Sequence, residues 1–220
     1  LAPQAAALAS ALAKQNPEAL AAALSGEIQR RMAEFVDGIE RYRRHPYRRR
    51  LESASDAPAL LWQHGSSRLL DYGDGGALAV LFVPSLINRA YILDLTRERS
   101  LMRYLAASGV RPMLLDWGAP EGEEREFGLD EYIAGRLDAA LDAALTAAGR
   151  PVALAGYCMG GLLAMPAALA RPGDVSSLVL MATPWDFHSA GQGEIIAALK
   201  LPLEAILSGL GVLPVDVIQA

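Results

Sequence analysis

The sequence contains one cysteine and three histidines in 220 residues, and its net charge at pH 7 is −5. A single cysteine, Cys158, excludes an internal disulfide and fits a reducing compartment. The negative charge argues against general nucleic-acid binding. No uninterrupted apolar stretch is long enough to cross a membrane and no secretory leader is recognisable, so we expect a cytoplasmic protein. The length allows a sizeable core, with one main domain as the default.

The cysteine stands in a stretch with a distinctive pattern. Residues 151–164 read Pro-Val-Ala-Leu-Ala-Gly-Tyr-Cys-Met-Gly-Gly-Leu-Leu-Ala, an apolar run of strand length followed by small residues with helix character. Between the two lies Gly-x-Cys-x-Gly-Gly, the nucleophile-elbow pattern with cysteine in place of serine. Gly156 and Gly160 suit an elbow because larger side chains would collide where the strand meets the helix.

We interpret Cys158 as the nucleophile of an acyl-transfer enzyme. At an elbow the sulfur lies at the carboxyl end of the sheet, and backbone N–H groups at the start of the next helix can hold a developing oxyanion. Two other interpretations stay open: a small buried apolar residue, or a glycine-rich turn that serves packing or phosphate binding. Residues 156–161 do not spell the dinucleotide pattern Gly-x-Gly-x-x-Gly.

Short apolar runs alternate with helical patterns over the middle of the chain. This alternation predicts an α/β fold, with a mostly parallel sheet and helices on both faces. The predicted strands are residues 60–64, 68–72, 78–83, 112–115, 152–155 and 177–182, and the predicted helices are 91–107, 130–148 and 159–170. In such sheets the active-site residues lie at the carboxyl ends of the strands. Three loops are expected to meet there: residues 84–90, residues 116–128 and the elbow.

The flanking segments differ in composition from this core. Residues 3–44 are rich in Ala and Leu and predict a helical hairpin, with Asn16 as a cap, Pro17 as a first helical residue and a break at Gly26. The hairpin is interpreted as a lid or packing element, or as a site for an acyl chain or a partner. The predicted domains are a hairpin and basic linker (1–58), the α/β core (59–190) and the start of a cap or lid (191–220).

Residues 41–50 hold six arginines. They form either a dock for an anionic group, such as a nucleotide phosphate or an acidic partner, or a solvated basic linker. His45 belongs to the same surface, and His64, ahead of the core strands, is interpreted as structural.

Three segments together resemble the polyhydroxyalkanoate synthases, cysteine-dependent members of the α/β-hydrolase fold. Besides the elbow at 156–161, residues 83–95 read Val-Pro-Ser-Leu-Ile-Asn-Arg-Ala-Tyr-Ile-Leu-Asp-Leu, similar to the family's Val-Pro-Pro-x-Ile-Asn-Lys-x-Tyr-Ile-Leu-Asp-Leu. The third segment is Leu-Asp-Trp-Gly at 115–118, followed by Asp-Glu-Tyr-Ile at 130–133. The resemblance covers about residues 60 to 190. Dienelactone hydrolases share the elbow but not the segment 83–95, which makes that segment the most specific.

The resemblance implies polymerisation of (R)-3-hydroxyacyl groups from coenzyme A thioesters into a polyester. Cys158 would take the acyl group, coenzyme A would leave, and a hydroxyl of the growing chain would accept the acyl group. The N–H of Met159 would form one half of the oxyanion hole. The other half would be an N–H of the loop after the strand 78–83, with Ile87 preferred and Leu86 as the next choice.

The resemblance also implies the substrate-binding residues and the partners. Asn88 and Tyr91 would order the loop that contains them, and Trp117, like Trp185, would line an acyl pocket or pack in the core. No cofactor and no metal are expected, because coenzyme A is part of the substrate. The expected partners are 3-hydroxyacyl-coenzyme A, the polyester chain, and a second copy or a second synthase subunit. The expected location is the cytoplasm or the surface of polymer granules.

A cysteine nucleophile normally needs a histidine base that an acidic residue holds. In this fold the chain order is nucleophile, acid, histidine. After Cys158 the sequence offers only His188, directly after the next predicted strand, and Asp186 matches a family segment that does not supply the triad acid. Neither is assigned to the triad. We expect the acid and the histidine beyond residue 220, an incomplete sheet on that side, and little turnover from these residues alone.

Two other functions stay open. One is a cysteine hydrolase that acts on a thioester, a lactone or a polyester, in which water rather than a hydroxyl reaches the acyl-enzyme. The other is a non-catalytic subunit at the granule, which would use the helical hairpin and the arginines.

Overall fold

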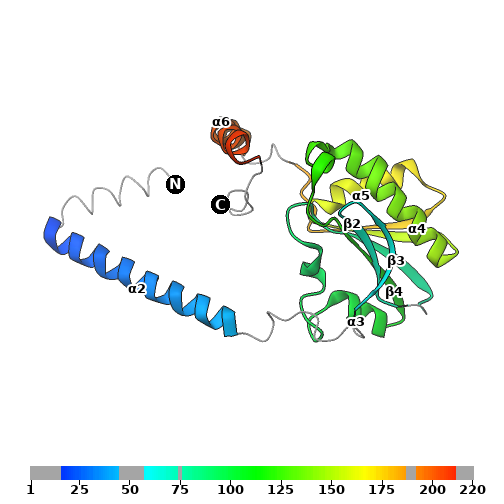
Figure 1. Ribbon diagram of the computed structural model, residues 1–220, viewed down its shortest axis with the longest axis horizontal. Coiled ribbons are helices and arrows are strands. Elements are labelled where there is room, and N and C mark those ends of the chain that lie inside the picture. The colour runs from blue at the N-terminus through cyan, green and yellow to red at the C-terminus, as the bar shows by residue number, and fades with distance from the viewer. Residues whose placement is uncertain (1–15, 45–56, 74–75, 187–191, 212–220) are drawn as a thin grey trace. The chain divides into compact units, whose positions relative to one another are not determined.

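The computed structural model describes residues 16–44, 57–73, 76–186 and 192–211. The chain divides into two units, residues 1–50 and 51–220, which are described separately (Figure 1). In the first unit a single helix, α2 (Pro17–Arg44), is described. Asn16 caps it as predicted, because its Oδ1 accepts the N–H groups of Glu18 and Ala19 at 2.9 and 3.4 Å.

The predicted break at Gly26 is wrong, because α2 continues through it for 28 residues. A glycine inside a helix costs roughly 1 kcal/mol relative to alanine, but ion pairs one turn apart support the helix. Glu27 pairs with Arg30 and Arg31 at 2.6 and 2.8 Å directly after the glycine. The predicted second helix, from about residue 27 to residue 42, is therefore not a separate arm but part of α2. The predicted helical residues before Asn16 lie outside the described residues.

The basic end of α2 is also paired within the helix. Arg41 contacts Asp37, while Arg43 and Arg44 contact Glu40. The remaining arginines of the predicted cluster, with His45, lie outside the described part of the chain. The apolar side of α2 is exposed, including Ile28, Met32, Phe35, Ile39 and Tyr42.

The second unit is built on a six-stranded sheet. Its strands are β1 (Ala59–His64), β2 (Ser67–Asp71), β3 (Leu78–Val83), β4 (Val110–Asp116), β5 (Val152–Tyr157) and β6 (Val175–Met181). Their order is β1-β2-β4-β3-β5-β6. Strands β4, β3, β5 and β6 pair in parallel, whereas β2 pairs antiparallel with both β1 and β4. Each strand lies within two residues of its predicted bounds, and the predicted mostly parallel α/β fold is confirmed.

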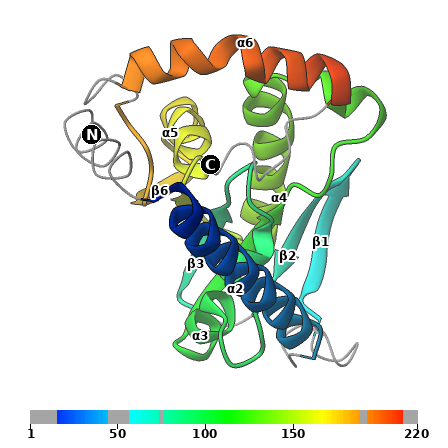
Figure 2. The ribbon, with the colours of Figure 1, turned by 90° about the vertical axis from the view of Figure 1, so that its left-hand side faces the viewer.

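Helices cover both faces of the sheet, as predicted. One face carries a π-helical segment, η5 (Glu131–Leu137), with α4 (Asp138–Ala148) and α5 (Gly160–Ala170). The other face carries a 3₁₀ helix, η3 (Ala90–Leu93), and α3 (Leu101–Ala107) (Figure 2). Successive side chains of a strand point to opposite faces, so Leu81 joins the first core and Phe82 the second. The remaining described helices are η4 (Gly122–Glu126) and α6 (Gln192–Leu210).

The predicted helix 91–107 is only partly correct. It is interrupted between η3 and α3, where Asp94 forms an isolated bridge with Ser100. Ser100 Oγ then accepts the N–H of Arg103 at 3.0 Å and caps α3. Short polar side chains compete with the helix for backbone groups, which explains the interruption. Among the helices of the described ranges, none is long and apolar enough to span a bilayer.

Candidate active site

Cys158 lies between the end of β5 and the start of α5. Its φ is +52°, in the left-handed region that residues other than glycine rarely adopt. Two backbone hydrogen bonds hold this conformation: the N–H of Cys158 donates to the carbonyl of Met181 at 2.8 Å, and its own carbonyl accepts the N–H of Gly161 at 3.0 Å. The residue is partly exposed. A cysteine held in this way presents its side chain at the carboxyl edge of the sheet, the arrangement of a nucleophile elbow.

Three glycines make the elbow sterically feasible. A Cβ on Gly156 would overlap the backbone of Gly161, and a Cβ on Gly161 would overlap the side chain of Thr183. A Cβ on Gly160 would overlap the carbonyl oxygens at the end of β3 and of Pro84. The elbow therefore packs directly against the beginning of the loop that follows β3.

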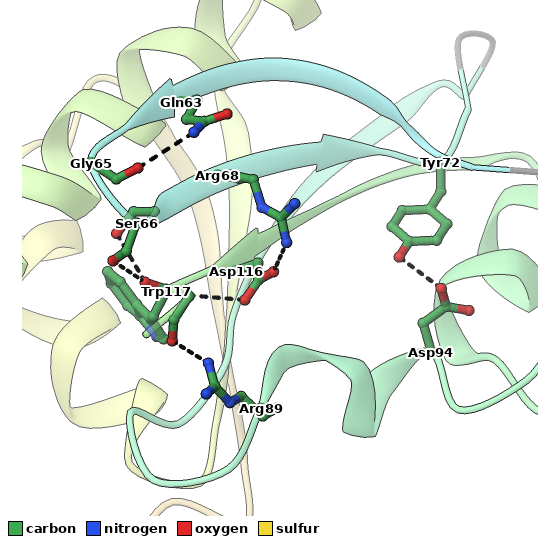
Figure 3. A network of polar contacts seen from close by, with 11 residues as sticks. Gln63, Gly65, Ser66, Arg68, Tyr72, Arg89, Asp94, Asp116 and Trp117 are labelled. Atoms are coloured by element: carbon green, nitrogen blue, oxygen red, sulfur yellow. Dashed lines mark hydrogen bonds and ion pairs between the residues drawn. The ribbon is translucent and has the colours of Figure 1, made fainter. Parts of the chain in front are cut away.

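The loop after β3 is tied to the loop after β4. The indole Nε1–H of Trp117 donates to the carbonyl of Pro84 at 3.0 Å, and the ring is only 6% exposed. Further along, Arg89 Nη1 donates to the carbonyl of Gly118 at 2.6 Å (Figure 3). These two bonds fix the loop after β3 at both ends.

Two of the N–H groups considered as oxyanion donors have no acceptor within the described residues. Among the hydrogen bonds of the described residues, none is donated by the N–H of Met159 or of Leu86. The N–H of Ile87, the preferred donor in the sequence-based prediction, donates to Ser85 Oγ at 3.1 Å. Met159 is half-buried and precedes the first residue of α5. The donor roles themselves stay predictions.

The predicted substrate-binding residues are not all together. Asn88 and Trp117 line a cavity of about 270 Å³ between the loops after β3 and β4, and Cys158 is not among its lining residues. Tyr91 lies in η3, is 42% exposed and does not line the cavity. The Trp117 ring also packs edge to face on Tyr132, with 5.5 Å between ring centroids. Trp185 is 72% exposed.

A buried ion pair supports the loop after β4 from beneath. Glu124 and Arg136 are each 7% exposed in their side chains and lie 2.7 Å apart. Burial alone would raise the pKa of Glu124, but hydrogen bonds from Ser66, the N–H of Glu121 and Arg136 outweigh it and lower the pKa below its ordinary value. Glu124 is therefore held as a carboxylate. The hydroxyl of Ser66 in turn donates to the carbonyl of Trp117 at 2.7 Å (Figure 3).

Polar contacts also fix the segment that follows the loop after β3. The hydroxyl of Tyr72 donates to Asp94 at 2.8 Å (Figure 3). Arg103 Nε donates to the other carboxylate oxygen at 3.3 Å. Burial, followed by the charge of Asp94, raises the pKa of Tyr72, so the phenol stays protonated. This cluster anchors η3 against the end of β2.

The described residues bring no histidine to Cys158. The only histidine in the described ranges, His64, is exposed at the end of β1, which is separated from β5 by β2, β4 and β3. His188 lies outside the described residues, and Asp186 is exposed. Within the ranges that the structure describes, no group of three His, Cys, Asp or Glu side chains is arranged to hold a metal ion.

Sequence reasoning missed three residues at this edge of the sheet. Ser85 and Arg89 were considered only as parts of a motif, although both bond to loop backbone. Thr183 was given no role, yet its Oγ1 is buried against the elbow without a hydrogen-bond partner among the described residues. It follows Ala182, the other described non-glycine residue with a positive φ, at +50°. No spacing of residue types in the sequence predicts any of these contacts.

The sequence profile of the alpha/beta hydrolase fold family matches residues 78–204, more than half of the chain, and the protein therefore belongs to that family. Within it, the sequence is similar to the poly(3-hydroxyalkanoate) polymerase subunit PhaC of Allochromatium vinosum, with 38% identity over 111 residues, covering 50% of this chain and 31% of that protein. The PhaC subunit of Synechocystis sp. is 31% identical over 146 residues, covering 63% of this chain and 39% of that protein. The resemblance to polyhydroxyalkanoate synthases is confirmed.

The chain thus spans between about three and four tenths of the length of these two relatives. Among solved structures, the thioesterase domain from the curacin biosynthetic pathway matches with a TM-score of 0.47 and 16% identity, covering 73% of this chain and 62% of that one.

Proposed function

We propose that this chain is the nucleophile-bearing part of a polyhydroxyalkanoate polymerase. The observation that carries the proposal is Cys158 in a left-handed conformation at the elbow between β5 and α5, with the N–H of Met159 uncommitted beside it. Similarity to polymerase subunits supports a polymerase over a hydrolase or a non-catalytic granule subunit. The substrate would be a (R)-3-hydroxyacyl thioester of coenzyme A, and no separate cofactor would be needed.

In the first step the sulfur of Cys158 attacks the thioester carbonyl carbon. The carbonyl oxygen takes up the electron pair, and the N–H of Met159 with an N–H of the loop after β3 stabilises the resulting negative charge. The pair returns as the carbon–sulfur bond to coenzyme A breaks, which leaves the acyl group on Cys158. Coenzyme A leaves as a thiolate and takes up a proton in place of the one that the Cys158 thiol gave up on attack. One thioester replaces another, so the loading step is nearly balanced in free energy.

In the second step a hydroxyl of the growing polyester attacks the acyl group on Cys158. The new ester bond forms as the acyl–sulfur bond breaks, and Cys158 leaves as a thiolate. This hydroxyl must lose its proton to a base, normally a histidine held by an acidic residue. We propose that both come from polypeptide outside these 220 residues, or from a second subunit, because the relatives are longer. The protein would act in the cytoplasm or at the surface of the polymer granule.

The proposal is tested by mixing the chain with 3-hydroxybutyryl-coenzyme A and measuring the free coenzyme A released, after it is separated from the protein. We expect release of up to one equivalent per chain, a mass increase on the peptide that contains Cys158, and neither change in Cys158→Ala. Slow or absent further turnover is expected without added polypeptide. Sustained release of free hydroxy acid would instead indicate a hydrolase. If iodoacetamide alkylates Cys158 but 3-hydroxybutyryl-coenzyme A does not acylate it, the proposal of acyl transfer is refuted.

A further inference from the structure

Ser85 is a buried hydroxyl at the beginning of the loop after β3. Its residue is 1% exposed, and its Oγ accepts the N–H of Ile87, two residues further along, at 3.1 Å. Serine hydroxyls that bond backbone in this way stabilise a local turn. The bond therefore fixes the direction of the backbone amides of Leu86 and Ile87.

This turn separates the two N–H groups that were candidates for the oxyanion hole. The N–H of Ile87 is occupied by Ser85, whereas the N–H of Leu86 donates to no acceptor within the described residues. The start of the same loop lies against the elbow, since Gly160 faces the carbonyl of Pro84 with no room for a Cβ. Leu86 is thus the candidate whose amide is open, and it stands two residues from the point of contact.

Hydrogen bonds to the loop after β4 fix the two ends of the loop after β3, whereas the bond to Ser85 lies within the loop itself. Trp117 holds the carbonyl of Pro84, and Arg89 reaches across to the carbonyl of Gly118. Oxyanion donors act through preorganisation, because they are already aimed at the position where charge develops. A turn that loses its internal bond would let the amides between the anchors reorient.

We propose that Ser85 is a positioning residue of the oxyanion hole. By holding the N–H of Ile87, it presents the N–H of Leu86, together with that of Met159, to the carbonyl oxygen of an acyl thioester that reacts with Cys158. The proposal rests on the proposed acyl transfer at Cys158 and assigns the second donor to Leu86.

Two reactions of the same sulfur separate this role from a general effect on folding. Alkylation by iodoacetamide has no tetrahedral intermediate, whereas acylation by 3-hydroxybutyryl-coenzyme A passes through one. Cys158 is the only cysteine, so both rates report one site. The ratio of acylation to alkylation, at one alkaline pH, therefore measures oxyanion stabilisation.

We expect Ser85→Ala to lower this ratio about three- to tenfold and to leave alkylation unchanged. Ser85→Thr keeps a hydroxyl and should restore most of the ratio. Ser100→Ala is the matched control, because Ser100 Oγ also accepts a backbone N–H, that of Arg103 at 3.0 Å, but at the start of α3. It should leave the ratio unchanged.

An unchanged ratio in Ser85→Ala overturns the proposal, even if both rates fall together. A higher ratio also overturns it, because Ile87 would then be a donor that Ser85 withholds. If the wild-type chain is alkylated but never acylated, the proposed function itself fails, and the role of Ser85 fails with it.

Discussion

The elbow after β5 and the loop after β3 meet at one edge of the sheet, but different forces hold them. The elbow depends on the absence of side chains, since Gly156, Gly160 and Gly161 have no room for a Cβ. The loop depends on the presence of side chains. Trp117 donates to the carbonyl of Pro84 at the start of the loop, and Arg89, at its far end, donates to the carbonyl of Gly118 in the next loop. Overlap of atoms in a packed backbone admits almost no adjustment, whereas a single hydrogen bond contributes about 1 kcal/mol. We therefore expect substitutions in the elbow to lower the stability of the protein, and substitutions in the loop to lower mainly the rate of acylation of Cys158.

The largest effect is expected for Gly160→Ala. The added methyl would overlap two backbone carbonyl oxygens, of Val83 and Pro84, which cannot turn aside. We expect the free energy of unfolding to fall by more than about 3 kcal/mol, at or beyond the upper end for overpacked cores, as measured by urea denaturation. Gly173→Ala is the control, because a Cβ there meets nothing within 4 Å, and it should change stability by less than about 0.5 kcal/mol. Similar losses for both would mean that the elbow is not under steric constraint.

An intermediate effect is expected beneath the loop after β4, where Glu124 accepts from Arg136 and the N–H of Ser66. Glu124→Gln keeps the shape but leaves the Arg136 charge without its partner, so we expect a loss of about 2–4 kcal/mol at pH 7. In the wild type the pKa of Glu124 is lowered on folding, so its stabilisation is complete above the unfolded value of about 4.3. It disappears as the pH falls through the folded value.

Urea denaturation of the wild type and Glu124→Gln between pH 7 and pH 3 tests this linkage. The difference in unfolding free energy should shrink as the pH falls below about 4. Glu123→Gln is the control at an exposed neighbouring carboxylate, and it should follow the wild type at every pH. A constant difference across the range would contradict the assigned direction of the pKa shift.

A smaller effect is expected for Trp117→Phe. The change keeps an aromatic ring in the core but removes the N–H that donates to Pro84, and it leaves that buried carbonyl without this donor. We expect a loss of about 1–3 kcal/mol in the free energy of unfolding and a lower ratio of acylation to alkylation at Cys158. Trp62→Phe, on β1, should leave the ratio unchanged. An unchanged ratio in Trp117→Phe would mean that the anchor at Pro84 does not set the position of the oxyanion loop.

The same contrast explains what sequence reasoning could reach. The strands were predicted within two residues because apolar runs bounded by Gly and Pro are local signals. The elbow was predicted because its glycines and its cysteine lie within six residues. The continuity of α2 through Gly26 was missed, because ion pairs one turn apart outweigh the cost of one glycine.

The hydrogen bonds that hold the loop after β3 could not be predicted from local sequence patterns. Its bonds from Trp117 and Arg89 join residues 33 and 29 positions apart. Only the folded arrangement decides which donor meets which carbonyl. The bond from Ile87 to Ser85 spans two residues, yet most serines form no such turn, so its presence could not be inferred either. The preference for Ile87 over Leu86 came from motif position and had no geometric support.

The smallest effect, and the finest test of the contrast, is expected for Arg89→Gln. Arg89 is exposed, and its bond to the carbonyl of Gly118 at 2.6 Å competes with water, so the unfolding free energy should fall by only about 0.5 kcal/mol. The acylation rate of Cys158 should still fall about two- to threefold, because the far end of the oxyanion loop loses an anchor. Arg150→Gln is the matched control: Arg150 is an exposed arginine that donates to the carbonyl of Gly76 at 2.5 Å, ahead of β3 and β5 at the amino ends of these strands. Equal acylation rates in the two variants would show that the loop is held without Arg89, and the contrast with the elbow would then rest on Ser85 and Trp117 alone.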